Sequence, residues 1–351
     1  MKFWNSTVKK LKPYVYGEQP APAKGVIKLN TNENPYPPHK ELRKLLSTLD
    51  INRLKYYPPP VCERLAGLIA KRYSVQSKFI FIGNGSDEIL SYLFRAFLNK
   101  EDTVLFTKYT YSLYTTLADI HGIAYKTLPM KNDFMIDLSL VRKYKAKLFF
   151  LTNPNAPTGM ALPAQDIEKA IRESPGTLFV IDEAYADFSN ENCIFLTKKY
   201  DNVIVLRTLS KSFSLCGIRL GYSIAKPYLT QALYKIKDSY NINLVTQLIA
   251  EHAFKKYPYY LKNCRKIIKT RENTAFKLKS LGFTVLPSKA NFIFCTHSTI
   301  NIKRLFLYLK KLKIYVRHFN NPVLDRYLRI SIGTEREMNE LFKNIKTYYS
   351  H

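Results

Sequence analysis

The sequence predicts an α/β fold: a mostly parallel sheet with helices on both faces, followed by a smaller α+β domain. Three observations lead to this prediction. Short, continuously apolar runs alternate with helical stretches through the middle of the chain, the last third changes to a different order of elements, and 351 residues can form a large domain and a small one. Apolar strands separated by helices are typical of a parallel sheet that is covered on both sides.

The predicted strands of the large domain share a high content of Val, Ile, Leu and Phe. They are KFIFIG (78–83), TVLFT (103–107), KLFFLT (147–152), TLFVID (177–182) and NVIVLRTL (202–209), and helices are expected at 88–98 and 164–174. In such a sheet, ligand chemistry collects where the strands end at their carboxyl side. Polar groups that directly follow these runs are therefore the first candidates for a site.

The C-terminal third predicts two strands within 283–297, a helix over 300–313, strands in KIYVRHF (313–319) and YLRISIG (327–333), and a final helix. Thr334 and Glu337 form a capping box at the start of that helix. The first segment is rich in proline and is expected to be an extended arm. The expected organisation is an arm at 1–28, a large domain at 29–240 and a small domain at 241–351.

Charge and cysteine content limit the classes of function. The excess of 55 Lys and Arg over 27 Asp and Glu gives a net charge of +28, which attracts anions of several kinds. Because Lys, Asn, Ile and Tyr are all abundant, we interpret most of this charge as solvated surface, and no DNA-binding module is recognisable. The five scattered cysteines argue against disulfides and against a zinc site.

We expect no metal, no nucleic-acid partner and no membrane association. The first residues are too polar for a secretory signal, and no apolar run is long enough to cross a bilayer. A cytoplasmic location is therefore expected.

Two glycine-containing stretches follow predicted strands. Gly85, Ser86 and Asp87 come after KFIFIG and open a helix, where free backbone N–H groups attract an anion such as phosphate. Ser86 or Asp87 could instead be an ordinary helix cap. The second stretch, NPNAPTG (153–159), follows KLFFLT, and its alternative is a rigid connection between strand and helix.

Two further stretches carry the reactive groups. The carboxylate of Asp182 ends an apolar strand, where it is costly unless it is paired, for example with a protonated ring nitrogen. Adjacent carboxylates could ligate magnesium, but the phosphate-binding loop that usually accompanies such a site is absent. Lys211 leaves the next strand, and desolvation there would free its amine to attack an aldehyde, although an isolated lysine is more often a solvated charge. Arg219 can offer its planar guanidinium to a phosphate.

Two arginines, Arg317 and Arg329, lie in otherwise apolar strand-like runs of the small domain. Such arginines need an anionic partner, and a carboxylate or phosphate of a substrate would suit both. Structural ion pairs with Asp325 or Glu335 are the alternative.

Taken together, these stretches resemble the fold-type I pyridoxal-5'-phosphate (PLP) aminotransferases, and among them the histidinol-phosphate aminotransferases. The resemblance covers nearly the whole chain. The superfamily is indicated by DEAY (182–185), TLSK (208–211) and the GxR at 217–219. The subfamily is indicated by LKPY (11–14), GEQP (17–20), KLNTNENP (28–35), YYP (56–58) and LRISIGT (328–334).

The resemblance implies a role for each matching position. Lys211 matches the lysine that binds PLP covalently and moves the substrate proton, Asp182 the carboxylate at the ring nitrogen, and Tyr185 the tyrosine at the phenolic oxygen. Tyr111 should lie over the ring face, although Tyr109 replaces the usual proline. The expected phosphate-binding residues are Gly85, Ser86, Asp87, Ser210 and Arg219, Tyr57 would reach the partner subunit's cofactor in a homodimer, and Tyr14, Arg317 and Arg329 would bind substrate.

One position departs from the pattern. Many relatives have NNPTG, whose second asparagine contacts the ring oxygen, but Ala156 stands at that position. Either Asn155 takes over this contact or Tyr185 makes it alone.

The implied reaction transfers an amino group between L-glutamate and imidazole acetol phosphate, giving 2-oxoglutarate and L-histidinol phosphate, a step of histidine biosynthesis. Three alternatives remain open. Two keep the PLP site: an aromatic amino-acid aminotransferase and a threonine-phosphate decarboxylase. The third is a regulator or nucleic-acid binder with the same fold.

Overall fold

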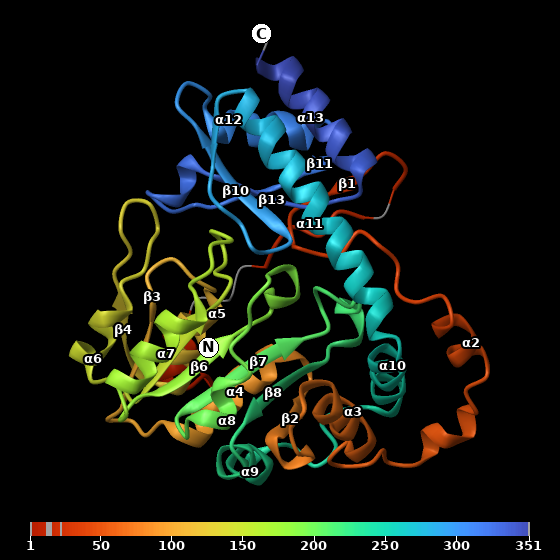
Figure 1. Cartoon of the computed structure of the whole chain (residues 1–351), viewed down its shortest axis with the longest axis vertical. Helices are drawn as coiled ribbons and strands as arrows, with labels where there is room; N and C mark the ends of the chain where they lie inside the picture. Colours follow the sequence, from red (N-terminus) through yellow and green to blue (C-terminus); the bar gives the residue numbers. More distant parts are fainter. Residues whose placement is uncertain (1, 12–15, 22, 350–351) are drawn as a thin grey trace.

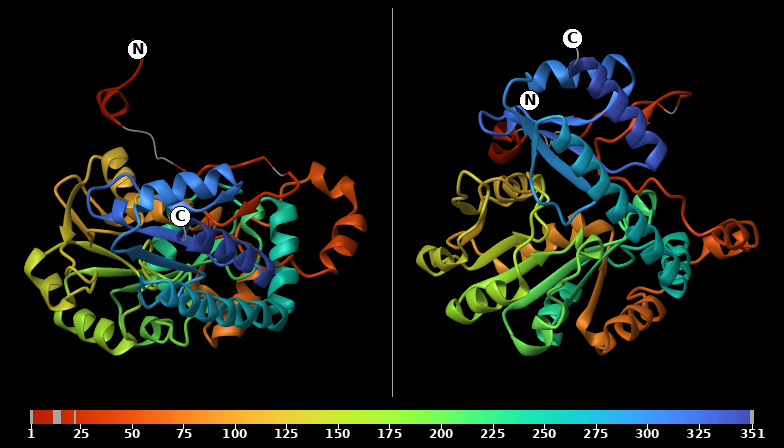
Figure 2. Two further views of the ribbon diagram at one scale, coloured as in Figure 1. Left: turned by 90° about the horizontal axis from the view of Figure 1, so that it is seen from above. Right: turned by 45° about the horizontal axis from the view of Figure 1, so that its top comes forward.

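The structure is a computed structural model, and it describes residues 2–11, 16–21 and 23–349. A seven-stranded sheet forms its lower part in Figure 1, and the C-terminal segment forms a second, smaller part above it. Figure 2 shows the same two parts from two further directions. Predicted and observed fold class agree.

The large sheet has the strand order β2-β8-β7-β6-β5-β3-β4, and β8 is its one antiparallel member. The five strands that were predicted are present, whereas β4 and β8 were not predicted. The strands are β2 (Ile80–Gly83), β3 (Thr103–Thr107), β4 (Ala124–Leu128), β5 (Leu148–Thr152), β6 (Leu178–Asp182), β7 (Val203–Thr208) and β8 (Gly221–Ala225).

Alternating side chains of these strands enter two separate cores, as the period of a β-strand requires. Phe149 and Ile181 pack on one face with α3, α7 and α10, while Phe150 and Val180 pack on the other with α4, α5 and α9. The helices are α3 (Glu63–Tyr73), α4 (Gly85–Phe97), α5 (Leu113–His121), α6 (Val141–Tyr144), α7 (Ala164–Glu173), α8 (Leu196–Lys199), α9 (Pro227–Ile236) and α10 (Leu244–Lys255).

The C-terminal part contains a four-stranded antiparallel sheet with the order β12-β13-β10-β9. Its core packs against the second half of α11 and against α12 and α13, and the predicted capping box is present, with Glu337 Oε2 accepting from Thr334 N at 2.7 Å. The elements are β9 (Phe283–Val285), β10 (Phe292–His297), β11 (Ile314–Tyr315), β12 (Arg317–His318), β13 (Leu328–Ser331), α11 (Tyr257–Ser280), α12 (Ile302–Lys311) and α13 (Glu335–Tyr349).

Two segments connect the parts. Helix α11 runs from the lower part into the upper one, and β1 (Ile27–Lys28) pairs with β11, so the N-terminal segment also contacts the upper part (Figure 1). Helix α10, which lies after the predicted boundary at residue 241, packs against α3 in the core of the large sheet. The division at residue 241 stays a prediction.

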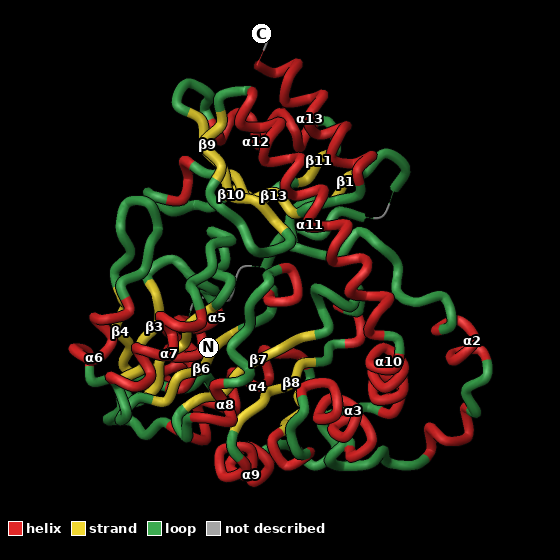
Figure 3. Tube along the Cα trace, viewed as in Figure 1, coloured by secondary structure: helices red, strands yellow, loops and turns green. Residues whose placement is uncertain are grey.

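The N-terminal segment is less extended than predicted, because Ser6–Lys10 forms the short helix α1, capped by Asn5 at the Val8 amide (2.8 Å). Helix α2 (Leu42–Ser47) and the 3-10 helix η1 (Ile51–Lys55) lie on a loop-rich excursion at the right of Figure 3. No helix among the described residues has both the length and the apolar composition that a bilayer crossing requires.

Candidate active site

The carboxyl edge of the large sheet borders a cavity of about 510 Å³ that also reaches the C-terminal part. Segments that are distant in sequence meet here because the strands that precede them end at one edge. Thr152 and Asp182 end β5 and β6 in register, and Gly221 of β8 pairs with both Gly83 and Thr208. The predicted site residues that line the cavity are Ser86, Asp87, Tyr111, Asp182, Tyr185, Ser210, Lys211, Arg219, Arg317 and Arg329.

One end of the cavity is built from the start of α4 and from Arg219. Gly85 has φ +81°, and a Cβ atom there would lie 2.7 Å from Arg219 Nη2. A Cβ atom on Gly221 would lie 2.4 Å from the Ser86 amide nitrogen. The two glycines therefore allow β8, the first turn of α4 and the guanidinium to pack together.

Arg219 contacts three residues here, and one contact is the bond from its Nη1 to the Cys216 carbonyl (3.4 Å). Its Nη1 donates to Ser210 Oγ (3.3 Å), and its Nη2 lies 3.2 Å from Asp87 Oδ2. The amides at the start of α4 and this guanidinium form a positive site suited to a phosphate. Asp87 accepts from Tyr111 OH (3.2 Å) and is already paired with Nη2 of that guanidinium. A bound phosphate would compete with Asp87 for Arg219.

Asp182 lies deep in the cavity wall, with 4% of its surface exposed. Its carboxylate accepts from Tyr114 OH (2.9 Å) and from the Ala184 amide (3.1 Å). Burial raises its pKa to about 6 despite these hydrogen bonds, and the nearby Asp87 carboxylate adds to the rise. A cation placed against this carboxylate would therefore be strongly stabilised.

Lys211 is half-buried and faces into the same cavity as Asp182 and Arg219. Its Nζ donates to the Thr31 carbonyl oxygen (3.2 Å) and lies 6.0 Å from the centre of the Tyr185 ring. The backbone at and just after Lys211 is held by Asn34, whose Nδ2 donates to the carbonyls of Lys211 and Ser212 at 3.1 and 3.2 Å. The structure thus brings Lys211, Asp182 and Arg219 to one cavity.

Tyr185 is 8% exposed and packs edge-on against Phe292. Ala156 lines the cavity with Tyr185, but the side chain of Asn155 lies at a separate small cavity with Phe134 and Met160. The Asn155 amide nitrogen donates to Tyr109 O and Thr158 Oγ1, both at 3.0 Å. The geometry thus gives Asn155 no direct path to a ring oxygen in the cavity.

Arg317 and Arg329 line the cavity from the small sheet, where they are partners on β12 and β13. Both guanidinium groups lie 5.5 Å from the Phe319 ring, and Arg329 Nη2 donates to the Asn30 carbonyl (2.9 Å). Two cations at one wall form a second site for an anion.

Two of the predicted site residues that the structure describes, Gly85 and Tyr57, do not line this cavity, although Gly85 lies beside its lining residues Ser86 and Arg219. Tyr14 falls outside the described residues. Tyr57 is 80% exposed and stacks on Tyr240 with 4.4 Å between ring centres, so its predicted contact would be with a partner subunit.

Two functional candidates were missed. Tyr114 follows Tyr111 at helical spacing, which a search for polar groups after strands does not detect. Asn32 is part of the NTNENP motif, but its contact with Tyr185 OH (3.0 Å) joins positions 153 residues apart.

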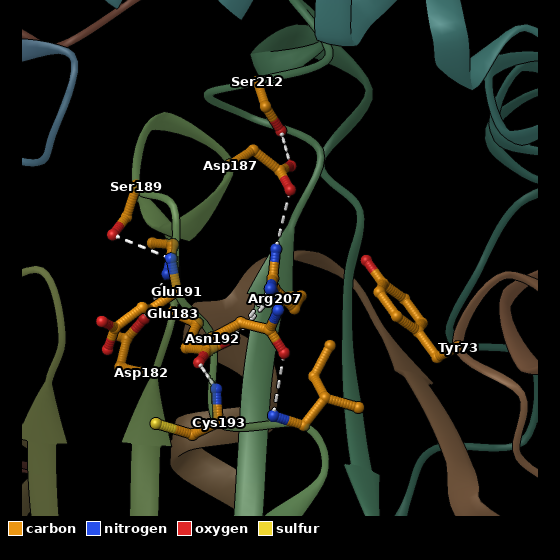
Figure 4. Close-up of polar contacts among 12 residues, drawn as sticks. Tyr73, Asp182, Glu183, Asp187, Ser189, Glu191, Asn192, Cys193, Arg207 and Ser212 are labelled. Carbon is orange, nitrogen blue, oxygen red and sulfur yellow. Dashed lines mark hydrogen bonds and ion pairs between the residues drawn. The ribbon is translucent and has the colours of Figure 1, made fainter. Parts of the chain in front are cut away.

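Figure 4 shows a network of buried polar contacts around Arg207. Arg207 of β7 contacts Glu183 and Asp187 at 2.8 and 2.9 Å, and Ser212 Oγ donates to Asp187 Oδ2. Glu183 also accepts from the Cys193 amide. Because Glu183 follows Asp182 and Ser212 follows Lys211, the network fixes the backbone beside both cavity residues.

Among the described residues, one group of side chains has a composition suited to a metal: His39, Glu41 and His252, with ligand atoms within 4.8 Å of one another. The Lys256 ammonium lies 2.9 Å from the Glu41 carboxylate and already supplies a cation there. None of the three residues lines the cavity, and we assign the group no function.

Comparison with known proteins identifies the family. The model of the aminotransferase class I and II family matches residues 24–345. The chain is a class I and II aminotransferase. It is 42% identical to the histidinol-phosphate aminotransferases of Clostridium acetobutylicum and Brachyspira hyodysenteriae over 348 residues, 98% of each chain. The crystal structure of histidinol-phosphate aminotransferase from Sinorhizobium meliloti in complex with pyridoxal-5'-phosphate has a TM-score of 0.88 at 24% identity, with 99% of both chains covered.

The cofactor of this family is pyridoxal 5'-phosphate, and the cavity of the aminotransferase fits it. A phosphate needs the positive site formed by α4 and Arg219, from which a side chain at Gly85 would displace the guanidinium. A protonated ring nitrogen needs a buried carboxylate, and Asp182, whose pKa is raised by burial, is such a group. An aldehyde needs an amine, and Lys211 supplies it within the same cavity.

Proposed function

We propose that this aminotransferase interconverts L-histidinol phosphate and 2-oxoglutarate with imidazole acetol phosphate and L-glutamate, in histidine biosynthesis. The observation that carries the proposal is one cavity with two anion sites, Arg219 beside the start of α4 and the Arg317–Arg329 pair on the small sheet, whose lining also contains Lys211 and Asp182. The names of relatives 40–42% identical across nearly the whole chain support the choice of substrate.

The residues have distinct roles in this proposal. PLP, when bound, supplies an electron sink for the negative charge that develops at the substrate's α-carbon. Asp182 holds the proton on the ring nitrogen and is itself held by Tyr114 OH and the Ala184 amide. Tyr185 would donate to the phenolic oxygen of the cofactor, and Tyr111 would cover its ring.

Lys211 would hold the cofactor through Nζ, and once the substrate's amino group has displaced it, the freed Nζ would move the proton at the substrate's α-carbon. The phosphate of PLP is held by Arg219, Ser210 and the first amides of α4, including those of Ser86 and Asp87. These contacts would keep the bound ring from turning between the two half-reactions.

The two arginines of the small sheet give the site its substrate preference. Arg317 and Arg329 bind the phosphate of histidinol phosphate in one half-reaction and a carboxylate of glutamate in the other. One anion site thus serves both substrates in turn, and positioning of the reacting bond contributes more than acid–base strength.

We further propose that the enzyme is a cytoplasmic homodimer in which Tyr57 contacts the cofactor phosphate of the partner subunit. Its 80% exposure and its position on the excursion that carries η1 support this role. An exposed pair of stacked tyrosines is also a suitable surface for a protein interface.

The test uses purified protein with PLP. Addition of L-histidinol phosphate should remove the visible absorbance of the lysine-bound cofactor, and addition of 2-oxoglutarate should restore it. L-phenylalanine as the better substrate would favour an aromatic aminotransferase, and carbon dioxide release from O-phospho-L-threonine would favour a decarboxylase. Salt-dependent DNA binding without any amino transfer would favour a regulator.

A further inference from the structure

Asn32 connects the candidate active site to the small sheet. It lies after β1, is 2% exposed and lines the cavity. Its backbone has φ +57°, a conformation that glycine, asparagine and aspartate adopt most readily. Its side-chain amide lies between the Tyr185 hydroxyl and the Ser331 hydroxyl, each at 3.0 Å.

The hydrogen bonds around Asn32 fix the direction of its amide. The Asn32 backbone N–H donates to Ser331 Oγ (2.8 Å), so the hydroxyl proton of Ser331 is free to donate to Asn32 Oδ1. The NH₂ group of the amide then faces Tyr185 and donates to its oxygen. Asn291 Nδ2 holds the Asn32 carbonyl (2.9 Å), so the residue is fixed on three sides.

The direction of the Asn32 amide decides whether the Tyr185 hydroxyl can donate a hydrogen bond into the cavity. Its oxygen accepts from Asn32, so its own proton is available to the cavity, and contact with Phe292 keeps the ring in place. Ala156 presents a methyl group to the same cavity, and the Asn155 amide donates elsewhere. Neither of these two residues adds a donor beside Tyr185.

We propose that Asn32 is a positioning residue that makes the Tyr185 hydroxyl a hydrogen-bond donor toward the ring oxygen of the cofactor. This inference rests on the proposed function. It also ties the site to the strand of the substrate arginines, because Ser331 and Arg329 lie two positions apart on β13.

The experiment measures two properties of the purified holoenzyme: the pH midpoint of the visible absorbance of the lysine-bound cofactor and the PLP dissociation constant. The variants are Asn32→Gly, Asn32→Asp, Tyr185→Phe and the double variant Asn32→Gly/Tyr185→Phe. Glycine keeps the positive φ while it removes the amide, and aspartate keeps the shape but cannot donate. The control is Asn202→Ala, which loses donors to Ser174 O and Thr177 O between β6 and β7, away from the cavity.

The ring oxygen is negatively charged, and the proton on the nitrogen that joins Lys211 to the cofactor partly neutralises it. When that proton leaves, the Tyr185 donor stabilises the oxygen, so loss of the donor raises the pH midpoint. We expect a rise of about one pH unit in Tyr185→Phe, a smaller rise in Asn32→Gly, and about tenfold weaker PLP binding in Tyr185→Phe. Asn32→Asp should raise the midpoint at least as far as Tyr185→Phe, because the Tyr185 hydroxyl then donates its hydrogen bond to the carboxylate and not to the ring oxygen.

In the double variant, the loss of Asn32 should add nothing to the loss of the Tyr185 hydroxyl. Additive shifts, a wild-type midpoint in Asn32→Asp, or an equal shift in Asn202→Ala would each overturn the role of Asn32 while the proposed function stood. A wild-type protein that fails to bind PLP would overturn the proposed function and this inference with it.

Discussion

Both Nε and Nη2 of Arg207 lie 2.8 Å from the same carboxylate oxygen of Glu183, and the two side chains are 5% and 1% exposed. Burial alone would make either charge very costly, so each is stable because the other is present. The pair joins the residue that follows Asp182 to β7, the strand that leads to Lys211. It therefore holds two site residues in relation to each other without touching the cavity.

Glu183→Gln should destabilise the cofactor-free protein by about 3–5 kcal/mol. The buried Arg207 charge would then keep one of its two carboxylate partners, Asp187. Urea unfolding followed by circular dichroism measures this change. Glu41→Gln breaks an ion pair with Lys256 at the surface and should have little effect. Equal losses in the two variants would show that burial of the Arg207 pair is not what matters.

Lys211→Ala should abolish both the visible absorbance of bound PLP and amino transfer, because the variant lacks the cavity amine that would bind the aldehyde. The absorbance spectrum after addition of PLP and removal of the excess is the measurement. Lys226→Ala is a suitable control, since Lys226 pairs with Asp201 at the opposite edge of the sheet. Retention of the absorbance in Lys211→Ala would refute the assignment of the lysine.

Asp182→Asn should change how the stability of the cofactor-free protein depends on pH. The pKa of Asp182 is raised from 3.8 to about 6, so the folded protein binds this proton more tightly than the unfolded chain does. The resulting stability is present below pH 4 and is lost as the pH rises through 6. Relative to wild type, Asp182→Asn should therefore gain on the order of 2–3 kcal/mol across this window.

Urea unfolding at a series of pH values measures that difference, and Asp201→Asn, at an exposed position, should not show it. Addition of PLP should reverse the order of stability above pH 6, because the ionised carboxylate then faces a cationic ring nitrogen. If the free energies of unfolding of Asp182→Asn and wild type differed by the same amount from pH 4 to 7, the raised pKa of the buried Asp182 carboxyl would be contradicted.

Arg329→Ala should raise the KM for L-histidinol phosphate and for L-glutamate together, each by roughly 10- to 100-fold, because a charged hydrogen bond to both substrates is lost. Steady-state kinetics of the two half-reactions give the values. Arg326→Ala removes the same charge from an exposed position nearby and should leave both unchanged. A raised KM for one substrate alone would mean that the two substrates bind through different arginines.

Tyr57→Phe should weaken PLP binding if the enzyme is a homodimer with shared sites. Mixed with Lys211→Ala under conditions of subunit exchange, it should recover about a quarter of the wild-type sites, since each hybrid dimer contains one site with both residues intact. Cofactor absorbance after mixing measures the recovery. No recovery, together with a monomeric mass in sedimentation, would contradict the shared site.

The large sheet was predictable because its strands are continuous apolar runs. Strand β8 was missed because GYSIA follows directly on the loop of Lys211 and Arg219, where the polar motif dominates the pattern. Strand β4 was missed because AYKTL lies at the sheet edge with four of its five residues exposed. Edge strands lack the apolar signal on which such a prediction depends.

The site was predictable where a polar residue follows a strand, as at Asp182 and Lys211. Tyr114 and Asn32 were not predictable. Tyr114 reaches Asp182 from the buried side of a helix, and Asn32 lies in a loop 153 residues before Tyr185 in the sequence. The Glu183–Arg207 pair was also missed, since a buried ion pair between neighbouring strands has no spacing signature. Sequence patterns located the groups that act, and tertiary contacts were needed to find the groups that hold them.

The cavity takes its walls from segments as far apart as Tyr16 and Arg329. No isolated fragment of the sheet could reproduce it, so capture of the coloured cofactor would require nearly the entire chain to be natively assembled. The yellow colour of the purified enzyme would therefore measure the fraction of correctly folded molecules. It would distinguish them from molecules that are in solution but misfolded.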